Sequence, residues 1–143
     1  MYKKVIFDIT YPNKKTDYEI KKLVGSQFSF IERIKMKGIG TQKMIISDAS
    51  DNIFSLITNY TDTPYCNIEL RKNGIVVGFS SNMRIYCWTI PYYKLVIVQQ
   101  GSELTISTSD TYITMQPSFN SVIDKSFIVK MLEQKSAAAG DLN

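Results

Sequence analysis

The feature that most constrains this sequence is a change in apolar period near residue 27, after which apolar side chains tend to recur at every second position. Turn-forming residues interrupt this pattern every eight to twelve positions as far as residue 116. Alternation at period two is typical of half-buried strands, and regular turns between short strands are typical of sandwiches and barrels. The sequence therefore predicts a mainly antiparallel β protein.

The expected strands follow one another with short connections. They cover residues 28–36, 42–47, 53–59, 66–72, 75–80, 84–90, 93–99, 102–108 and 111–116. The clearest signal is Asn73-Gly74, because these residue types favour the two positive φ angles of a type I′ turn. We expect a tight hairpin with this turn between residues 68 and 79.

Before residue 27 the pattern predicts one strand and one short helix. Alternating apolar residues over 4–11 indicate a strand that stops at Pro12. Thr16 and Glu19 have the spacing of a capping box, and Gly25 suits the left-handed position that ends a helix. We expect a helix over residues 17–24, with a strand as the alternative because the apolar pattern covers only about two turns.

The last segment of the chain has helical rather than strand spacing. Its apolar residues are Ile123, Phe127, Ile128, Met131 and Leu132. Ser121 and Asp124 have capping-box spacing, so a helix over residues 122–135 is predicted. Because the strands over 84–90 and 93–98 are apolar on both faces, we expect this helix to cover one of them.

The length of 143 residues is typical of one domain. We expect a main domain over residues 41–135, with residues 1–40 added to it as a basic strand-helix extension. Residues 136–143 have little to bury and are expected to form a flexible tail.

The positive charge is concentrated near the N-terminus. Residues 1–43 hold ten Lys/Arg against four Asp/Glu, whereas residues 44–143 hold seven against nine, which gives the net charge of +4. The candidate binding residues in this part are Lys14, Lys15, Lys21, Lys22, Arg33, Lys35 and Lys37. A basic face attracts nucleic acid, anionic lipid or an acidic protein, while the simpler interpretation is an ordinary solvated lysine surface.

Aromatic residues suggest two further binding surfaces. Phe28 and Phe30 alternate with the basic residues of the expected strand over 28–36, a mixture that single-stranded nucleic acid binders use, although half-buried strands also show it. Trp88, Tyr92 and Tyr93 cluster around a proline and are candidates for a ligand platform or an interface. Core packing is the favoured alternative for this cluster.

Missing residue types exclude several kinds of chemistry. The chain has no histidine, which removes imidazole bases, Ser-His-Asp and Cys-His nucleophiles, and histidine-bound metals. Dinucleotide, P-loop and Cys-x-x-Cys motifs are also missing. We therefore expect a protein that is not an enzyme and that uses no cofactor and no metal.

The sequence also bears on the compartment. No apolar run approaches the roughly 20 residues of a membrane-spanning helix, and the apolar run near the N-terminus is too short for an export signal. Cys66 and Cys87 lie in apolar segments and are expected to be buried free thiols. Together these features predict a cytoplasmic protein without a transmembrane segment.

Residues 66–135 resemble the pleckstrin-homology-like (PH-like) fold of small bacterial proteins. The resemblance depends on the Asn73-Gly74 hairpin, the bend at residues 88–92, the strand at 94–98 and the closing helix that ends at residues 127–132. It implies a bent antiparallel β-sandwich or partly open barrel, capped by the C-terminal helix. Lipid-binding members carry basic residues in a long first hairpin loop, whereas here Lys72 stands beside a two-residue turn, so phosphoinositide binding is not expected.

These observations favour a non-enzymatic binding or scaffolding module that recognises a protein partner through sheet edges and aromatic surface, with self-association as one form of this. The alternative is a basic-surface binder of nucleic acid or anionic membrane that acts through the N-terminal lysines. The two differ in salt dependence, because binding to nucleic acid weakens steeply as the ionic strength rises.

Overall fold

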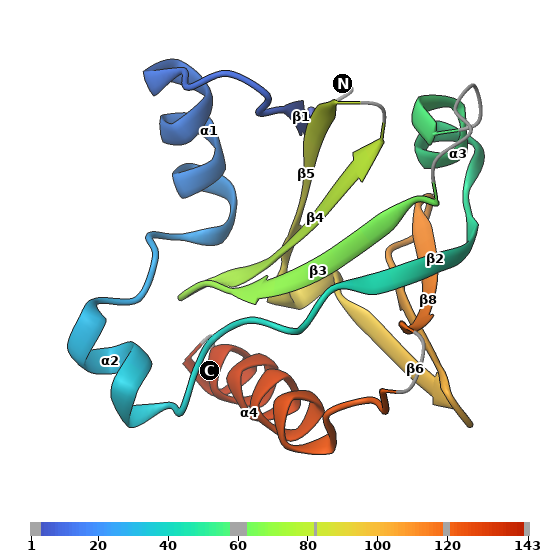
Figure 1. Ribbon diagram of the computed structural model, residues 1–143. Coiled ribbons are helices and arrows are strands. Elements are labelled where there is room, and N and C mark those ends of the chain that lie inside the picture. The colour runs from blue at the N-terminus through green and yellow to red at the C-terminus, as the bar shows by residue number, and fades with distance from the viewer. Residues whose placement is uncertain (1–3, 58–62, 82, 119–120, 142–143) are drawn as a thin grey trace.

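The computed structural model describes residues 4–57, 63–81, 83–118 and 121–141 (Figure 1). Its helices are α1 (Lys14–Val24), α2 (Phe30–Lys35), α3 (Asp51–Ile57) and α4 (Lys125–Asp141), with a 3-10 turn η1 at Tyr92–Lys94. Its strands are β1 (Ile6–Asp8), β2 (Met44–Ala49), β3 (Tyr65–Leu70), β4 (Gly74–Ser81), β5 (Arg84–Pro91), β6 (Val96–Gln100), β7 (Glu103–Ser107) and β8 (Tyr112–Pro117).

The eight strands found within the described residues form a single sheet in the order β1-β5-β4-β3-β2-β8-β7-β6. Every neighbouring pair is antiparallel. Two meanders, β2 to β5 and β6 to β8, are joined where β2 pairs with β8, and β2 carries a register shift between Ile46 and Asp48. The prediction of a mainly β chain with a C-terminal helix is confirmed; the observed form is an open sheet with β1 and β6 at its two edges.

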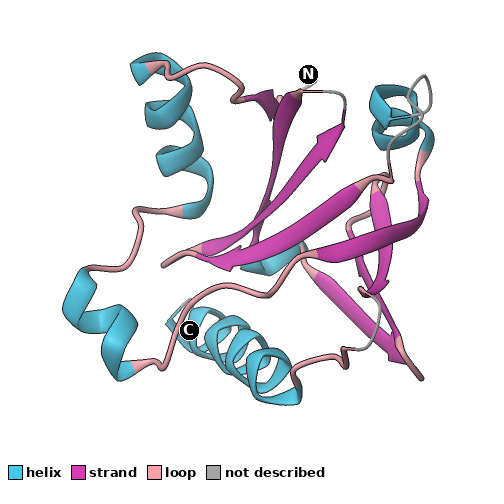
Figure 2. Cartoon of the chain, viewed as in Figure 1, coloured by secondary structure: helices cyan, strands magenta, loops and turns pink. Residues whose placement is uncertain are grey.

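One apolar core unites both meanders. Side chains from β2, β3, β4, β5, β7 and β8 meet Ile53 and Ile57 of α3 and Phe127, Ile128 and Met131 of α4. Helices α3 and α4 lie at opposite ends of the sheet, as Figure 2 shows. Phe127 and Met131 are almost fully buried in the same core as Trp88 and Ile90, so the C-terminal segment packs on one face of β5 as expected. It does not cover β6, which is mostly exposed.

The outer face of β4 and β5 carries a second, smaller core. Ile20 and Val24 of α1 pack against Phe7, Val76 and Cys87. These strand residues point away from the main core because side chains alternate across a sheet. Since β1 pairs with β5, the N-terminal extension contributes a strand to the main sheet as well as a helix that covers it.

The predicted hairpin is present, but its turn differs from the predicted one. Leu70 pairs with Ile75, the Arg71 N–H donates to the Gly74 carbonyl at 2.9 Å, and neither Asn73 nor Gly74 has a positive φ. The type I′ turn at Asn73-Gly74 is therefore wrong. Instead the turn is held from outside: Asn73 donates its N–H to the Val24 carbonyl at 2.8 Å.

Two predicted strands are helices. Residues 30–35 of the strand expected at 28–36 form α2, because Ser29 and Glu32 make a capping box that the strand interpretation overlooked. Most of the strand expected at 53–59 is α3, and residues 58–59 lie outside the described part. Ile53 and Ile57 are four residues apart, a spacing that fits one face of a strand and one face of a helix equally well.

Other elements differ from the prediction mainly in the residues at which they begin and end. β1 spans only Ile6–Asp8 of the strand expected at 4–11, and Tyr11 is 77% exposed. Residues 92–94, expected to begin a strand, form η1 after Pro91. α4 begins after Asp124 and continues to Asp141, so residues 136–141 of the expected tail are helical, in line with the strong helix propensity of the alanines there.

Candidate functional site

The predicted basic residues of α1 lie on its exposed side. Lys14, Lys15, Lys21 and Lys22 are all exposed, while Ile20 and Val24 face the sheet. Lys22 lies over the ring of Tyr18, with 5.5 Å from Nζ to the ring centroid. None of these lysines appears in an ion pair within the described residues. Their charge is therefore available to an anionic partner.

The predicted basic residues around α2 behave differently from one another. Arg33 is partly buried, and its Nε donates to the Phe28 carbonyl at 3.0 Å, so it braces the entry to the helix. Lys35 and Lys37 are exposed. Figure 1 shows α1 and α2 on the same side of the molecule.

Of the three predicted aromatic residues, only Tyr93 is at the surface. Trp88 and Tyr92 are each 1% exposed and pack in the main core. The Tyr92 hydroxyl donates to the Arg71 carbonyl at 2.8 Å, and burial raises its pKa. Tyr93 is 72% exposed and stands just before β6. The cluster is thus divided between core and surface.

Sequence reasoning missed the apolar surface of α2. No residue of this helix is buried, and Phe30, Ile31 and Ile34 are 76%, 65% and 62% exposed. At 100° per residue these three positions lie within about 100° of the helix circumference. The signal was in the sequence, since the capping box at Ser29–Glu32 places a helical period on these residues.

Edge strand β6 is the second surface that the fold leaves open. Within the described residues it pairs only with β7, through Val96↔Ser107 to Gln100↔Glu103. In a two-residue hairpin the pair next to the turn is hydrogen-bonded, and such pairs alternate along the ladder. The N–H and C=O groups of Ile97 and Gln99 therefore face the open edge.

Nothing in β6 protects that edge. Natural edge strands carry lysine, proline or bulges, or are very short. β6 consists only of Val, Ile and Gln, and Val96 and Val98 are 51% and 44% exposed. The opposite edge, β1, has three residues and ends at Asp8, which is paired with Arg84 at 2.9 Å.

A groove of about 1140 Å³ opens between the ends of β1 and β5, the start of β6 and the β7–β8 turn. Two of the hydrogen bonds made by its polar side chains join the segments that line it to one another. Thr89 Oγ1 donates to the Val5 carbonyl at 3.0 Å, and Asn52 Nδ2 donates to Thr111 Oγ1 at 2.8 Å. The first bond joins β5 to the chain just before β1, and the second joins α3 to the β7–β8 turn.

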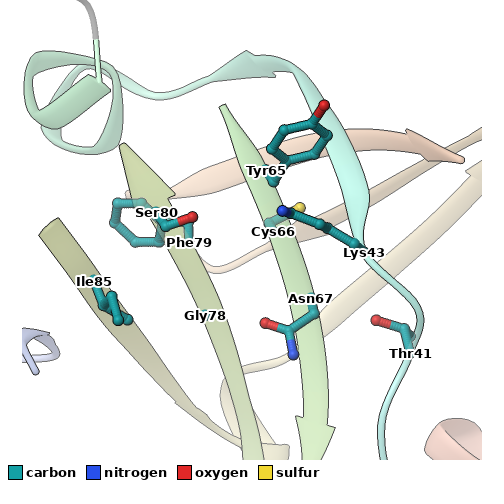
Figure 3. Close-up of a pocket in the computed structure, with 9 residues that line it drawn as sticks. All are labelled: Thr41, Lys43, Tyr65, Cys66, Asn67, Gly78, Phe79, Ser80 and Ile85. Carbon is teal, nitrogen blue, oxygen red and sulfur yellow. The ribbon is translucent and has the colours of Figure 1, made fainter. Parts of the chain in front are cut away.

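A shallower hollow of about 340 Å³ lies on the outer face of β3, β4 and β5 (Figure 3). Lys43 extends over Tyr65, with 4.3 Å from Nζ to the ring centroid. Asn67 lies across Gly78, where a Cβ would come within 2.8 Å of its Oδ1. The hollow presents an aromatic ring, an amide and one cation, and no carboxylate or histidine lines it. This set suits contact rather than acid–base chemistry.

The two cysteines are free and buried, as predicted. Desolvation raises the pKa of each thiol to about 12. A thiol with so high a pKa remains protonated at neutral pH and is a poor nucleophile and metal ligand. Among the described residues, no three His, Cys, Asp or Glu side chains gather as a metal site.

No helix in the described part of the chain is long and apolar enough to cross a bilayer. Comparison with known proteins found no matching family model, no matching curated protein and no matching solved structure. The candidate binding surfaces of the described residues are therefore the edge of β6 and the exposed face of α2.

Proposed function

We propose that this protein is a non-enzymatic binding module that holds a protein partner by adding a strand of that partner to β6. The observation that carries the proposal is the unprotected edge: the backbone groups of Ile97 and Gln99 face outward from a strand without charge or proline. Strand addition is a common mode of peptide recognition, in which main-chain hydrogen bonds supply the affinity.

The surroundings of β6 support a protein rather than a polyanion as the partner. Val96 and Val98 offer apolar contact, and Tyr93, an aromatic residue of the kind enriched at interfaces, is exposed close to the start of the strand. Thr105 of β7 and Thr114 of β8 share a hydrogen bond of 2.8 Å on the same side of the sheet. Self-association through β6 is one form of this proposal.

We also propose that residues 66–135 have a PH-like fold. The order of two antiparallel meanders followed by a C-terminal helix, β2 to β8 and then α4, supports it. In this interpretation α1, α2 and β1 are additions to a partly open barrel. We also propose that the protein is cytoplasmic.

The backbone of β6 gives a direct test. Gln99→Pro removes the outward N–H, and proline is tolerated on the open side of an edge strand. Gln99→Ala changes the same side chain but keeps the N–H. We expect tagged wild type and Gln99→Ala to recover one stoichiometric protein from native lysate, and Gln99→Pro to recover at least tenfold less, as the loss of about 1.4 kcal/mol or more in binding gives.

Light scattering on the purified variants identifies the partner if it is a second copy. In that case wild type and Gln99→Ala are dimers, and Gln99→Pro is a monomer. Equal recovery by Gln99→Pro and wild type, with no change in mass, would contradict strand addition at β6. Recovery of nucleic acid alone, lost on adding salt, would favour a polyanion as the partner instead.

A further inference from the structure

We infer that the exposed face of α2, together with the lysines of α1 and α2, is a docking surface for an anionic lipid bilayer. This goes beyond strand addition at β6, since it concerns a different surface and a different class of partner. The docking surface is defined here as Phe30, Ile31 and Ile34 with Lys14, Lys15, Lys21, Lys22, Lys35 and Lys37.

The apolar part of this surface projects from the molecule. Phe30, Ile31 and Ile34 are each more than 60% exposed. Helix α2 has no buried residue, yet the chain on both sides of it is anchored, because Phe28 and Ile39 belong to the main core. The helix therefore projects from the fold between two anchored segments, and none of its residues is fully buried.

Specific contacts fix α2 in this position. At its start, Ser29 Oγ accepts from the Glu32 N–H at 3.2 Å, and Glu32 Oε1 accepts from the Ser29 N–H at 2.9 Å. At its end, the Lys130 ammonium of α4 donates to the carbonyls of Met36, Lys37 and Gly38 at 3.1, 3.2 and 3.1 Å. The three apolar side chains are held outward by these bonds and need no rearrangement to meet a partner.

Helices α1 and α2, which lie on the same side of the molecule in Figure 1, carry positive charge that is complementary to an anionic surface. The six lysines are exposed and take part in no ion pair among the described residues. Glu32, the acidic residue within α2, is already paired with Lys72 at 3.7 Å and bonded to Ser29. Each lysine close to an anionic leaflet raises the affinity about fivefold.

A bilayer accounts for these residues better than other polyanions or proteins do. Single-stranded nucleic acid binders stack bases on aromatic rings, whereas Ile31 and Ile34 offer no ring. Lysine is depleted at protein–protein interfaces. Apolar side chains that enter the headgroup region beside a set of lysines are typical of interfacial membrane binding, in which apolar area and charge act together.

The test is sedimentation with phosphatidylcholine vesicles that contain or lack phosphatidylserine. We expect the full chain to bind the phosphatidylserine vesicles, with weaker binding at raised salt. The double substitution Phe30→Ser with Ile34→Ser should lower the affinity about a hundredfold, from about tenfold for each large apolar side chain. Phe54→Ser is the matched control, because Phe54 is an exposed residue on α3, on the other side of the molecule (Figure 1).

The charge is tested separately with Lys14→Glu combined with Lys15→Glu. Acidic residues are favourable in the first turn of a helix, so this pair does not weaken α1. The affinity should fall at least about 25-fold, from fivefold or more for each lysine. Lys125→Glu, in the first turn of α4, should leave binding unchanged.

Three results would overturn the inference. The first is no sedimentation with phosphatidylserine vesicles. The second is an equal loss of binding in the α2 double variant and in Phe54→Ser. The third is that the chain binds single-stranded oligonucleotides and does not sediment with vesicles. Gln99→Pro should sediment like the wild type, so failure at β6 and failure at α2 are distinguishable.

Discussion

Gly74 shows how a single residue decides the geometry of a turn. A Cβ at this position would lie 2.3 Å from the Ile90 carbonyl oxygen and 2.9 Å from the Pro91 Cα, both backbone atoms that cannot move aside independently. The glycine is needed because β4 and β5 approach closely there, and not because of its φ. The same turn is held by the Tyr92 hydroxyl on the Arg71 carbonyl.

We expect Gly74→Ala to lower the free energy of unfolding by about 1–3 kcal/mol, because the added methyl group forces two strands apart. Urea denaturation followed by circular dichroism measures this. Gly140→Ala is the control: nothing lies within 4 Å of that position in α4, so the variant should be neutral or more stable by up to about 1 kcal/mol. Equal stability of Gly74→Ala and wild type would show that the strands do not meet as described.

At the scale of elements, the helices begin at residues that satisfy their free N–H groups. Asn13 Oδ1 accepts from the N–H of Lys15 at 2.9 Å and of Thr16 at 3.2 Å, so α1 begins a turn earlier than the sequence predicted. Asp124 caps α4 in the same way, accepting from the N–H of Ser126 and of Phe127. In both helices the predicted capping residue, Thr16 or Ser121, is close to the cap but is not the cap.

Asn13→Ala should therefore lower the free energy of unfolding by about 1 kcal/mol, the usual cost of a lost helix cap. Thr16→Ala should cost less, because in the structure the Thr16 side chain does not cap α1. Thermal denaturation distinguishes them, since 1 kcal/mol corresponds to a fall of about 4 °C in Tm. A larger fall in Tm for Thr16→Ala than for Asn13→Ala would favour the capping box that the sequence predicted.

At the scale of the whole molecule, α4 completes the core that the two meanders share. Phe127 and Met131 are 2% and 0% exposed against side chains from both meanders, whereas Val129 on the same helix is 51% exposed. An open sheet of this kind depends on such a cover, because its inner face would otherwise be in water.

Phe127→Ala should cost about 3–5 kcal/mol of unfolding free energy, through lost burial and the cavity that remains. Val129→Ala, two residues along α4 and on its exposed side, should change it by less than about 0.5 kcal/mol. Guanidinium denaturation of both variants compares them directly. Similar values would mean that α4 does not pack on the sheet through the face described.

The two open surfaces lie on different sides of the molecule. In Figure 1, α2 is at the left and β6 points to the lower right. A bilayer at α2 would therefore leave β6 free for a partner strand. Together the two proposals describe a small adaptor that holds a protein close to an anionic membrane.

The spacing of apolar residues was sufficient to predict secondary structure where it fitted only a strand or only a helix. The alternation from residue 65 to 117 predicted six strands close to their observed positions, and the spacing of Phe127 and Met131 predicted the covering helix. Short segments with two possible periods could not be assigned, because Ile53 and Ile57 share a face in a strand and in a helix. For this segment the packing of Ile53 and Ile57 against strands of the main core decides between them, whereas α2 had a local signal in its capping box.

For the candidate binding surfaces too, some properties could be predicted from the sequence and others depended on tertiary structure. The sequence by itself determined that the N-terminal lysines carry the excess charge and that the chain has no histidine, because these follow from the identity and order of the residues. It did not determine which aromatic and aliphatic residues reach the surface. Burial is decided by which elements pack together, so only the tertiary structure placed Trp88 in the core, Phe30 in solvent and β6 at an edge.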